Sequence, residues 1–156
     1  MTTDLVKFAE EKGVKYFMVS YTDIFGAQRA KLVPTAAIGE MQEDGAGFAG
    51  FSTYLKMSPA DPDMLAIPDR SAAIQLPWKP DVAWVPANLM MEGEEVAQAP
   101  RNVLRRMVAE ADALGLRVKT GIEAEFFFVV GTVRQVTATP RTTQRIRGKF
   151  QIALCR

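Results

Sequence analysis

The feature that most constrains the fold of this chain is the segment "KTGIEAEFFFVV" at residues 119–130, an apolar run that carries two glutamates two positions apart. Its aromatic and β-branched residues predict a strand, which we extend back to residue 116. Side chains on a strand alternate between two faces, so Glu123 and Glu125 share one face. The opposite face, which we assign to the core, carries Leu116, Val118, Ile122, Ala124, Phe126 and Phe128. The fold must therefore hold two negative charges side by side next to buried apolar residues.

The two glutamates need water or a partner. Their Cα atoms would lie about 6.6–7 Å apart, given the rise of a strand per residue. Two ionised carboxylates so placed repel each other, and burying either one alone is costly. Three alternatives remain open at this point: the face is solvated, Arg or Lys side chains neutralise it, or divalent cations bind the carboxylate oxygens.

Composition narrows the chemistry that the chain can perform. It has no histidine and a single cysteine, Cys155, so we exclude an internal disulfide and a Cys-rich metal site. Without histidine, catalysis and metal binding fall to carboxylates. The net charge of +1 gives no reason to expect an anionic membrane as a partner. No apolar run approaches the roughly 20 residues of a membrane span, and the start lacks the form of a signal peptide, so we expect a cytoplasmic protein without membrane contact.

The rest of the chain predicts short helices and strands in alternation. Prolines break residues 58–86 into short pieces, which limits the strands there. We expect helices at 2–14 and 35–47, a hairpin of strands at 15–23 and 27–34 with "DIFG" as its turn, an extended segment at 48–57, and strands at 72–78 and 81–91.

The clearest helix is "APRNVLRRMVAEADALG" at residues 99–115. Pro100 suits its first turn and Gly115 its C-terminal cap. Its apolar stripe, which we expect to pack on a sheet, consists of Val103, Leu104, Met107, Val108, Ala111 and Leu114.

Four motifs in the same order and spacing resemble the glutamine synthetase family. "GIEAEFFFV" resembles the Gly-x-Glu-x-Glu-Phe-Phe strand that opens the catalytic domain of that family. "YFMVSYTDIFGAQRAKLVP" resembles its early hairpin, "DPDMLAIPD" its Ser-Asp-Met-x-x-x-Pro-Asp segment, and "APRNVLRRMVAEADALG" the helix before the metal strand. The resemblance covers about residues 1–130 and is greatest to bacterial type III-like glutamine synthetases and γ-glutamylmethylamide synthetases.

This resemblance implies an α+β fold. Residues 1–98 would form a β-grasp-like N-terminal domain, and residues 99–130 the first helix and strand of a truncated α/β catalytic domain. Residues 131–156 would be a divergent basic tail, which we expect to be disordered. In the family, subunits form a homo-oligomeric ring in which the N-terminal domain covers the active site of the neighbouring subunit.

The resemblance also implies a ligase of glutamine biosynthesis and nitrogen metabolism. Such an enzyme phosphorylates the γ-carboxylate of glutamate with ATP, its co-substrate, and then lets ammonia or a small amine such as methylamine displace the phosphate. By the same resemblance Glu123 and Glu125 become ligands of Mg²⁺ or Mn²⁺ on the inner face of the active-site barrel. No catalytic or ATP-binding residue is assigned within this chain.

One position departs from the family pattern in a way that bears on the amine. Family members that use ammonium carry an aspartate in a Phe-Asp-Gly-Ser-Ser loop, and the matching stretch here is "GFAGFST", with Ala49 at that place. A methyl group cannot accept a proton, so either another residue does so or the substrate is methylamine or another alkylamine. Asp63 and Asp69 also match family positions, but we expect both to be structural.

The resemblance ends at about residue 131. The tail holds six basic residues and no acidic one. We interpret it as the product of a frameshift after Val130, because a shifted reading of "ATPRTTQRI" can give Asp-Pro-Ala-Asp-Asn-Ala-Glu, which resembles the polar loop of relatives. A basic arm for nucleic acid is the competing interpretation, and we expect no nucleic-acid partner. Since the catalytic domain has barely begun, we expect no activity from this chain alone; the alternative function is a non-catalytic β-grasp module that contacts full-length synthetase subunits.

Overall fold

The structure is a computed structural model that describes residues 4–53, 57–121, 123, 125–128 and 146–149. The chain divides into two compact units, Met1–Glu110 and Ala111–Arg156. None of the helices in the described ranges has the length and apolar character needed to cross a membrane.

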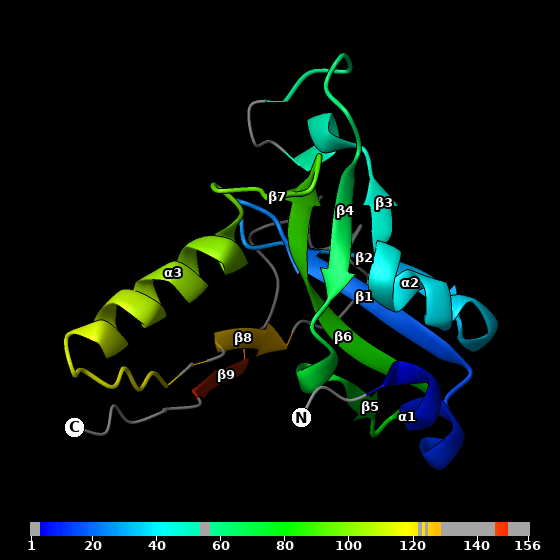
Figure 1. The fold of residues 1–156 in the computed structure, drawn as a ribbon. Coiled ribbons are helices and arrows are strands. Elements are labelled where there is room, and N and C mark those ends of the chain that lie inside the picture. Colours follow the sequence, from blue (N-terminus) through cyan, green and yellow to red (C-terminus); the bar gives the residue numbers. More distant parts are fainter. Residues whose placement is uncertain (1–3, 54–56, 122, 124, 129–145, 150–156) are drawn as a thin grey trace, which may run out of the picture. The chain divides into compact units, whose positions relative to one another are not determined.

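The first unit is built on a mixed sheet with strand order β2-β1-β6-β4-β3 (Figure 1). Its long strand β6 pairs in parallel with β1 and antiparallel with β4, while the short strands β5 and β7 also pair with β6. The seven strands are β1 (Tyr16–Thr22), β2 (Gln28–Pro34), β3 (Ala46–Phe48), β4 (Met64–Pro68), β5 (Ile74–Leu76), β6 (Lys79–Met91) and β7 (Glu94–Glu95). A mixed sheet with few helices confirms the predicted α+β class and its β-grasp-like N-terminal domain.

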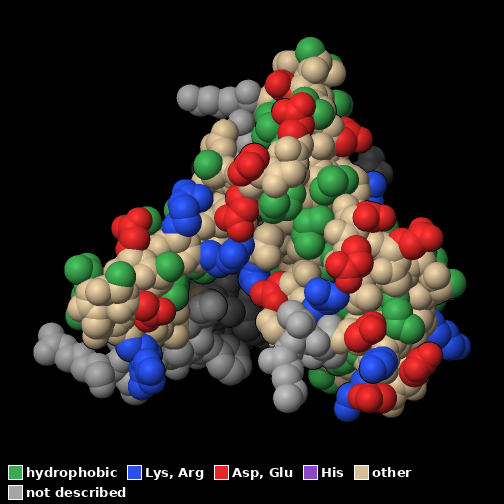
Figure 2. All heavy atoms as spheres, viewed as in Figure 1, with side chains coloured by type: hydrophobic (Ala, Val, Ile, Leu, Met, Phe, Trp, Pro, Cys, Tyr) green, Lys and Arg blue, Asp and Glu red, His purple; other side chains and the backbone are tan. Residues whose placement is uncertain are grey.

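Few helices accompany this sheet, and the sequence explains where they begin and end. The helices are α1 (Leu5–Lys12), α2 (Ile38–Asp44) and α3 (Pro100–Ala113), with short 3-10 turns η1 (Thr35–Ala37), η2 (Gly50–Thr53) and η3 (Arg70–Ala72). The carboxylate of Asp4 accepts the N–H of Val6 at 2.9 Å and caps α1, which ends at Gly13 with φ 67°. Acidic and basic side chains are interspersed on the surface around α1 (Figure 2).

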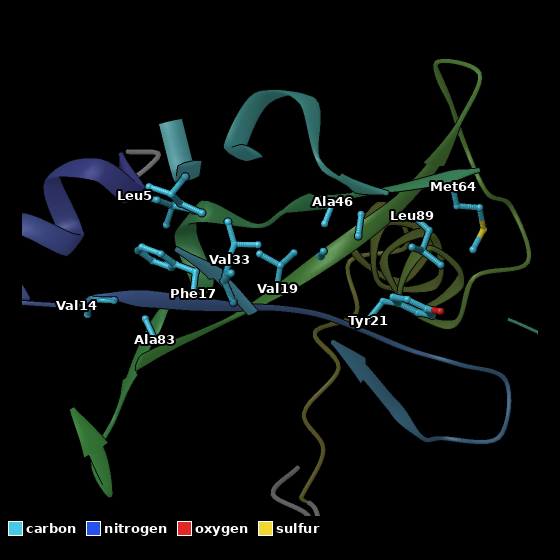
Figure 3. Packing of buried hydrophobic residues seen from close by; sticks show 14 of the residues in the cluster. Leu5, Val14, Phe17, Val19, Tyr21, Val33, Ala46, Met64, Ala83 and Leu89 are labelled. Carbon is cyan, nitrogen blue, oxygen red and sulfur yellow. The ribbon is translucent and has the colours of Figure 1, made fainter. Parts of the chain in front are cut away.

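The hydrophobic core lies on the face of the sheet that α1 and α2 cover. Alternate residues of β1, namely Phe17, Val19 and Tyr21, are buried there against Leu5 of α1 and Ile38 of α2 (Figure 3). The side chains between them point to the opposite face, where Met18 and Thr22 are half-buried and Ser20 is buried. The tilted rings of Phe8 and Phe17, 6.2 Å between centroids, close one end of the core.

Most predicted elements of this unit are confirmed, including the hairpin and its turn. The helix expected at 35–47 ends at Asp44, since Ala46 and Gly47 belong to β3, and the two-residue strand β7 was not predicted. Strand β4 was missed because its segment is rich in prolines, yet Pro68 lies at the strand's end where its missing N–H does no harm. The extended segment expected at 48–57 ends at Phe48, and residues Gly50–Thr53 form η2 instead.

The packing predicted for the apolar stripe of α3 is also wrong for this structure. Leu104 is 63% exposed and Met107 47%, and Val103, Val108 and Leu114 are exposed as well. The buried residue of α3 is instead Asn102.

The second unit begins near the end of α3. Gly115 has φ 73° and stops the helix as predicted, with the N–H of Leu116 donating to the carbonyl of Ala111. The strand predicted from 116 is shorter: residues 116–121 are not in a strand, and β8 covers only Glu125–Phe128. Leu116 and Val118, assigned to the core, are 59% and 57% exposed. Ile122 and Ala124 and the side chains of Phe126 and Phe128 lie outside the described residues.

Part of the basic tail is described as well. Strand β9 (Ile146–Lys149) pairs antiparallel with β8, with Glu125 opposite Lys149 in the register. The remainder of the tail lies outside the described residues, so its disorder, like the domain boundaries at 98 and 130, stays a prediction.

Candidate functional site

The predicted metal ligands belong to the second unit. Glu123 is exposed just before β8, and Glu125 is the first residue of β8. The side chain of Glu125 lies outside the described part of the structure. Carboxylate oxygens suit Mg²⁺ and Mn²⁺, but these ions take about six ligands. Among the described residues, no group of three or more His, Cys, Asp or Glu side chains could hold a metal ion. Two carboxylates fit the chemistry of such a site and supply only part of it.

Ala49, the residue predicted to bear on amine specificity, lies in the first unit between β3 and η2. It is half-buried, and its carbonyl accepts hydrogen bonds from the N–H and the hydroxyl of Ser52 at 3.1 and 2.8 Å. A Cβ added to the next residue, Gly50, would lie 2.6 Å from the Sδ of Met57 and 3.2 Å from the carbonyl oxygen of Pro62. The segment is therefore fixed by local hydrogen bonds and close packing, and it presents a methyl group where a proton acceptor was expected.

The turn of the β1–β2 hairpin is held by a buried carboxylate. Asp23 accepts the N–H groups of Phe25 and Ala27, both at 3.0 Å, and the Nε of Arg29 at 2.9 Å. Burial by itself would raise the pKa of Asp23, but the Arg29 guanidinium and the two backbone donors outweigh it and hold the pKa below the usual 3.8. Gly26 supplies the positive φ, 80°, that this turn requires. Asp23 is thus a structural residue of the hairpin.

Asp69 has the structural role that was expected of it. Its carboxylate accepts the hydroxyl and the N–H of Ser71 at 2.6 and 3.1 Å, and it pairs with the guanidinium of Arg101 on α3. The Ser71 hydroxyl is the main cause that keeps the pKa of Asp69 low, with Arg101 contributing. Arg101 also donates to Asn88 Oδ1 at 3.0 Å, so it joins the start of α3 to β6. Asp63 is exposed in the loop before β4.

The sequence did not indicate a pocket of about 290 Å³ in the first unit. Trp84 forms part of its wall and donates its indole N–H to Ser20 Oγ at 2.7 Å and to Gln28 Oε1 at 3.2 Å. The lining residues come from β1, β2, β6 and α3: Ser20, Tyr21, Thr22, Gln28, Trp84, Pro86, Ala87, Pro100, Arg101 and Leu104. None of the described residues that line it is acidic. The signal that could have found it is the alternation of β1 and β6, which puts Ser20 and Trp84 opposite the core face.

Comparisons with known proteins add a second line of observation. No family model matches the chain. The chain is 64% identical over 129 residues to "Glutamine synthetase" of Rhizobium leguminosarum bv. phaseoli, covering 83% of this chain and 30% of that protein. It is 59% identical over 145 residues to "Glutamine synthetase" of Rhizobium meliloti, covering 93% of this chain and 33% of the relative. A "Glutamate--methylamine ligase" of Methyloversatilis universalis is 34% identical over 122 residues, 77% of this chain and 28% of the relative.

The chain is also similar to solved structures. "GmaS/ADP complex-Conformation 1" and "Apo GmaS without ligand" each match with a TM-score of 0.78 and 51% identity, over 83% of this chain and 30% of theirs. The chain spans about a third of the length of the curated relatives it matches. The matched third is their N-terminal part.

Proposed function

Because this chain belongs to the glutamine synthetase family, we propose that it supplies the N-terminal portion of an ATP-dependent ligase that joins ammonia or a small amine to the γ-carboxylate of glutamate. The observation that supports this most is the 64% identity over 129 residues to a relative named glutamine synthetase. The agreement extends to structure, since 51% identity accompanies a TM-score of 0.78 to the GmaS chains.

In the proposed enzyme, Glu123 and Glu125 would hold a divalent cation, Mg²⁺ or Mn²⁺. Such an ion, when bound, supplies positive charge to the phosphoryl group that passes from ATP to glutamate. Only one residue separates them in the sequence, so both would lie close enough to serve one ion. The described residues offer no third ligand, so the remaining ligands would come from the catalytic portion of the relatives. We therefore expect no amide formation by the 156-residue chain alone.

The first unit would contribute to recognition of the amine. The half-buried methyl group of Ala49 cannot bind or deprotonate ammonium, and it leaves the position apolar. A relative named glutamate–methylamine ligase makes methylamine the second candidate substrate. The assembly we propose is a ring of identical subunits.

A chimera tests this proposal. Residues 1–130 of this chain are joined to the C-terminal portion of the Rhizobium leguminosarum glutamine synthetase, and γ-glutamyl amide formation is measured with ATP and glutamate. Ammonium and methylamine are compared in parallel, with the unmodified relative as the control. We expect ATP-dependent amide formation with at least one of the two amines. If the chimera folds and assembles like the relative but forms neither amide, the proposal is wrong.

A further inference from the structure

The pocket of about 290 Å³ in the first unit combines an apolar wall with a few polar side chains. Its apolar lining comes mainly from β6 and α3 and includes Trp84, Pro86, Pro100 and Leu104. Binding sites for small molecules have this composition, and the volume lies near the lower end of their range. The pocket therefore suits a small ligand with an apolar body.

Two polar side chains at the pocket are oriented by Trp84. An indole nitrogen can only donate, and that of Trp84 donates to Ser20 Oγ at 2.7 Å and to Gln28 Oε1 at 3.2 Å. Because Oε1 of Gln28 faces the indole, the amide nitrogen of Gln28 points away from it. The oxygen of Ser20 accepts from Trp84, so its hydroxyl proton can be donated elsewhere. Both side chains therefore offer donors to a bound molecule.

Arg101 adds a third donor group to the lining. A guanidinium carries five N–H groups. The Nε of Arg101 donates to Asn88 Oδ1 at 3.0 Å, and one terminal nitrogen pairs with Asp69. The other terminal nitrogen is used in neither bond, and the side chain is 32% exposed, so a ligand can reach it. Since the described residues of the lining include no carboxylate, they favour a ligand whose polar end accepts hydrogen bonds.

We propose that this pocket binds a small carboxylate with an apolar body. Ser20, Gln28 and Arg101 donate hydrogen bonds to the carboxylate. The apolar body packs against Trp84 and Leu104. Hydrogen bonds to an ionised acceptor are roughly twice as strong as those between neutral groups, so the acid binds more tightly than the matching neutral amide. This binding involves the first unit alone and does not depend on the ligase activity proposed above.

Titration of the full chain with phenylacetate, followed by NMR, tests the site. The chain has two tryptophans, so a proton–nitrogen correlation spectrum shows two indole signals, and Trp78→Phe identifies that of Trp84. Trp78 is 79% exposed and does not line the pocket, so its signal reports binding elsewhere. Phenylacetamide, the neutral amide of the same acid, is titrated in parallel. We expect phenylacetate to shift the Trp84 signal with a Kd on the order of 1 mM or tighter, and phenylacetamide to bind roughly tenfold more weakly.

Two variants place a negative charge at the pocket wall. Gln28→Glu keeps an acceptor for the indole of Trp84 and replaces the amide donor with an anionic oxygen. Leu104→Glu adds a carboxylate to the apolar wall. The matched controls are Gln98→Glu and Met107→Glu, since both residues are exposed and neither lines the pocket. Thermal unfolding verifies the fold of each variant, and either pocket variant serves if the other does not fold.

Each pocket variant should weaken phenylacetate binding roughly tenfold or more, because the new charge repels the carboxylate, while both controls bind it like the natural chain. The proposal fails if phenylacetate leaves the Trp84 signal unchanged up to about 10 mM, tenfold above the expected Kd. It also fails if phenylacetamide binds as tightly as phenylacetate, or if the pocket variants bind as tightly as their controls. A shift of the Trp78 signal as large as that of Trp84 would overturn it too, because binding would then not be confined to the pocket.

Discussion

Asn102 is the side chain on which the position of α3 most depends, and its replacement gives a sharp prediction. It is fully buried, and its Nδ2 donates to the carbonyl of Leu89 on β6 at 2.9 Å and to that of Val96 at 3.0 Å. Both bonds join α3 to the end of the sheet. We expect Asn102→Ala to weaken this junction and lower the free energy of unfolding.

The size of the effect follows from what each atom loses. Each carbonyl keeps one backbone donor, since Leu89 O also accepts the N–H of Val96, and Val96 O that of Ala99. Neither is left unsatisfied, so the loss is two ordinary hydrogen bonds at about 1 kcal/mol each. Asn102 Oδ1 has no hydrogen-bond partner among the described atoms, and removing it returns part of that loss. The net destabilisation should be about 1–2 kcal/mol.

Urea unfolding followed by tryptophan fluorescence measures this difference. With a slope of about 1–3 kcal/mol per molar urea for a small domain, the midpoint should fall by roughly 0.3–2 M. Arg105→Ala is the control on the same helix, because its exposed ion pair with Glu95 contributes little. Its midpoint should stay close to that of the natural chain.

Asn102→Asp separates hydrogen bonding from packing, because the two side chains have the same shape. A carboxylate here would face two carbonyl oxygens that it cannot satisfy, so the variant should be less stable than Asn102→Ala at neutral pH. Burial would raise its pKa, so the deficit relative to the natural chain should shrink as pH falls and the carboxyl becomes a donor. An Asn102→Asp variant as stable as the natural chain at neutral pH, or an Asn102→Ala midpoint equal to that of Arg105→Ala, would refute this reasoning.

Three further predictions concern the first unit. Asp23 has a lowered pKa in the folded state, so its contribution to stability is present above pH 3.8 and is lost as the pH falls through the folded pKa. Asp23→Asn should therefore flatten the fall of the urea midpoint between about pH 5 and 2. An unchanged dependence of the midpoint on pH in this range would count against this role. Gly45→Ala should lower the free energy of unfolding by about 1–3 kcal/mol, because φ is 80° and the new Cβ would lie 2.6 Å from Ile67 Cδ1. Gly13→Ala has open space around it and should lower it by about 1 kcal/mol in the same urea titration. Equal losses would contradict the steric argument. Arg101→Ala should lower the free energy of unfolding by about 1 kcal/mol or less, because it removes a partly exposed ion pair with Asp69. Added salt should reduce the difference in stability between this variant and the natural chain. A loss that does not depend on salt would point to packing instead.

Much of the first unit could be predicted because local signals and tertiary packing agree there. Asp4 and Gly13 mark both ends of α1 with the residues that helix caps need, and the alternation of β1 places Phe17 in the core as expected. Strand β4 was not predicted, because Pro68 was taken to interrupt a strand. A proline is tolerated at the end of a strand, where Pro68 lies.

The apolar stripe of α3 was predicted as a face but not as an exposed one. Periodicity identifies which residues share a face, but not what covers that face. Leu104 and Met107 form the stripe as predicted and remain exposed in this structure, since the buried contact of the helix comes from the polar Asn102. Pattern analysis gave that residue no weight, because its burial depends on carbonyls 13 and 6 residues away.

For the candidate sites too, local features could be predicted from the sequence, whereas contacts between distant residues could not. The structural role of Asp69 could be expected from its place before a turn, but its pairing with Arg101, 32 residues away, needed the fold. The pocket could not be predicted from the sequence, because its lining residues come from four separate elements, β1, β2, β6 and α3. Glu123 and Glu125 remain a prediction that rests on their spacing and on the resemblance to the family, since the side chain of Glu125 lies outside the described residues.

The most direct test of the proposed metal ligands is to measure how the rate of amide formation by the chimera depends on Mn²⁺ when Glu123 or Glu125 is replaced. Glu123→Gln and Glu125→Gln keep the size of the side chain and remove the anionic ligand. We expect each variant to need more Mn²⁺ or to lose activity, by at least the roughly 10- to 100-fold that follows loss of a group supporting a metal site. Glu110→Gln on α3 should behave as the parent chimera. Unchanged rates and unchanged Mn²⁺ dependence in both glutamine variants would contradict the central claim that these two residues are metal ligands of a glutamate–amine ligase.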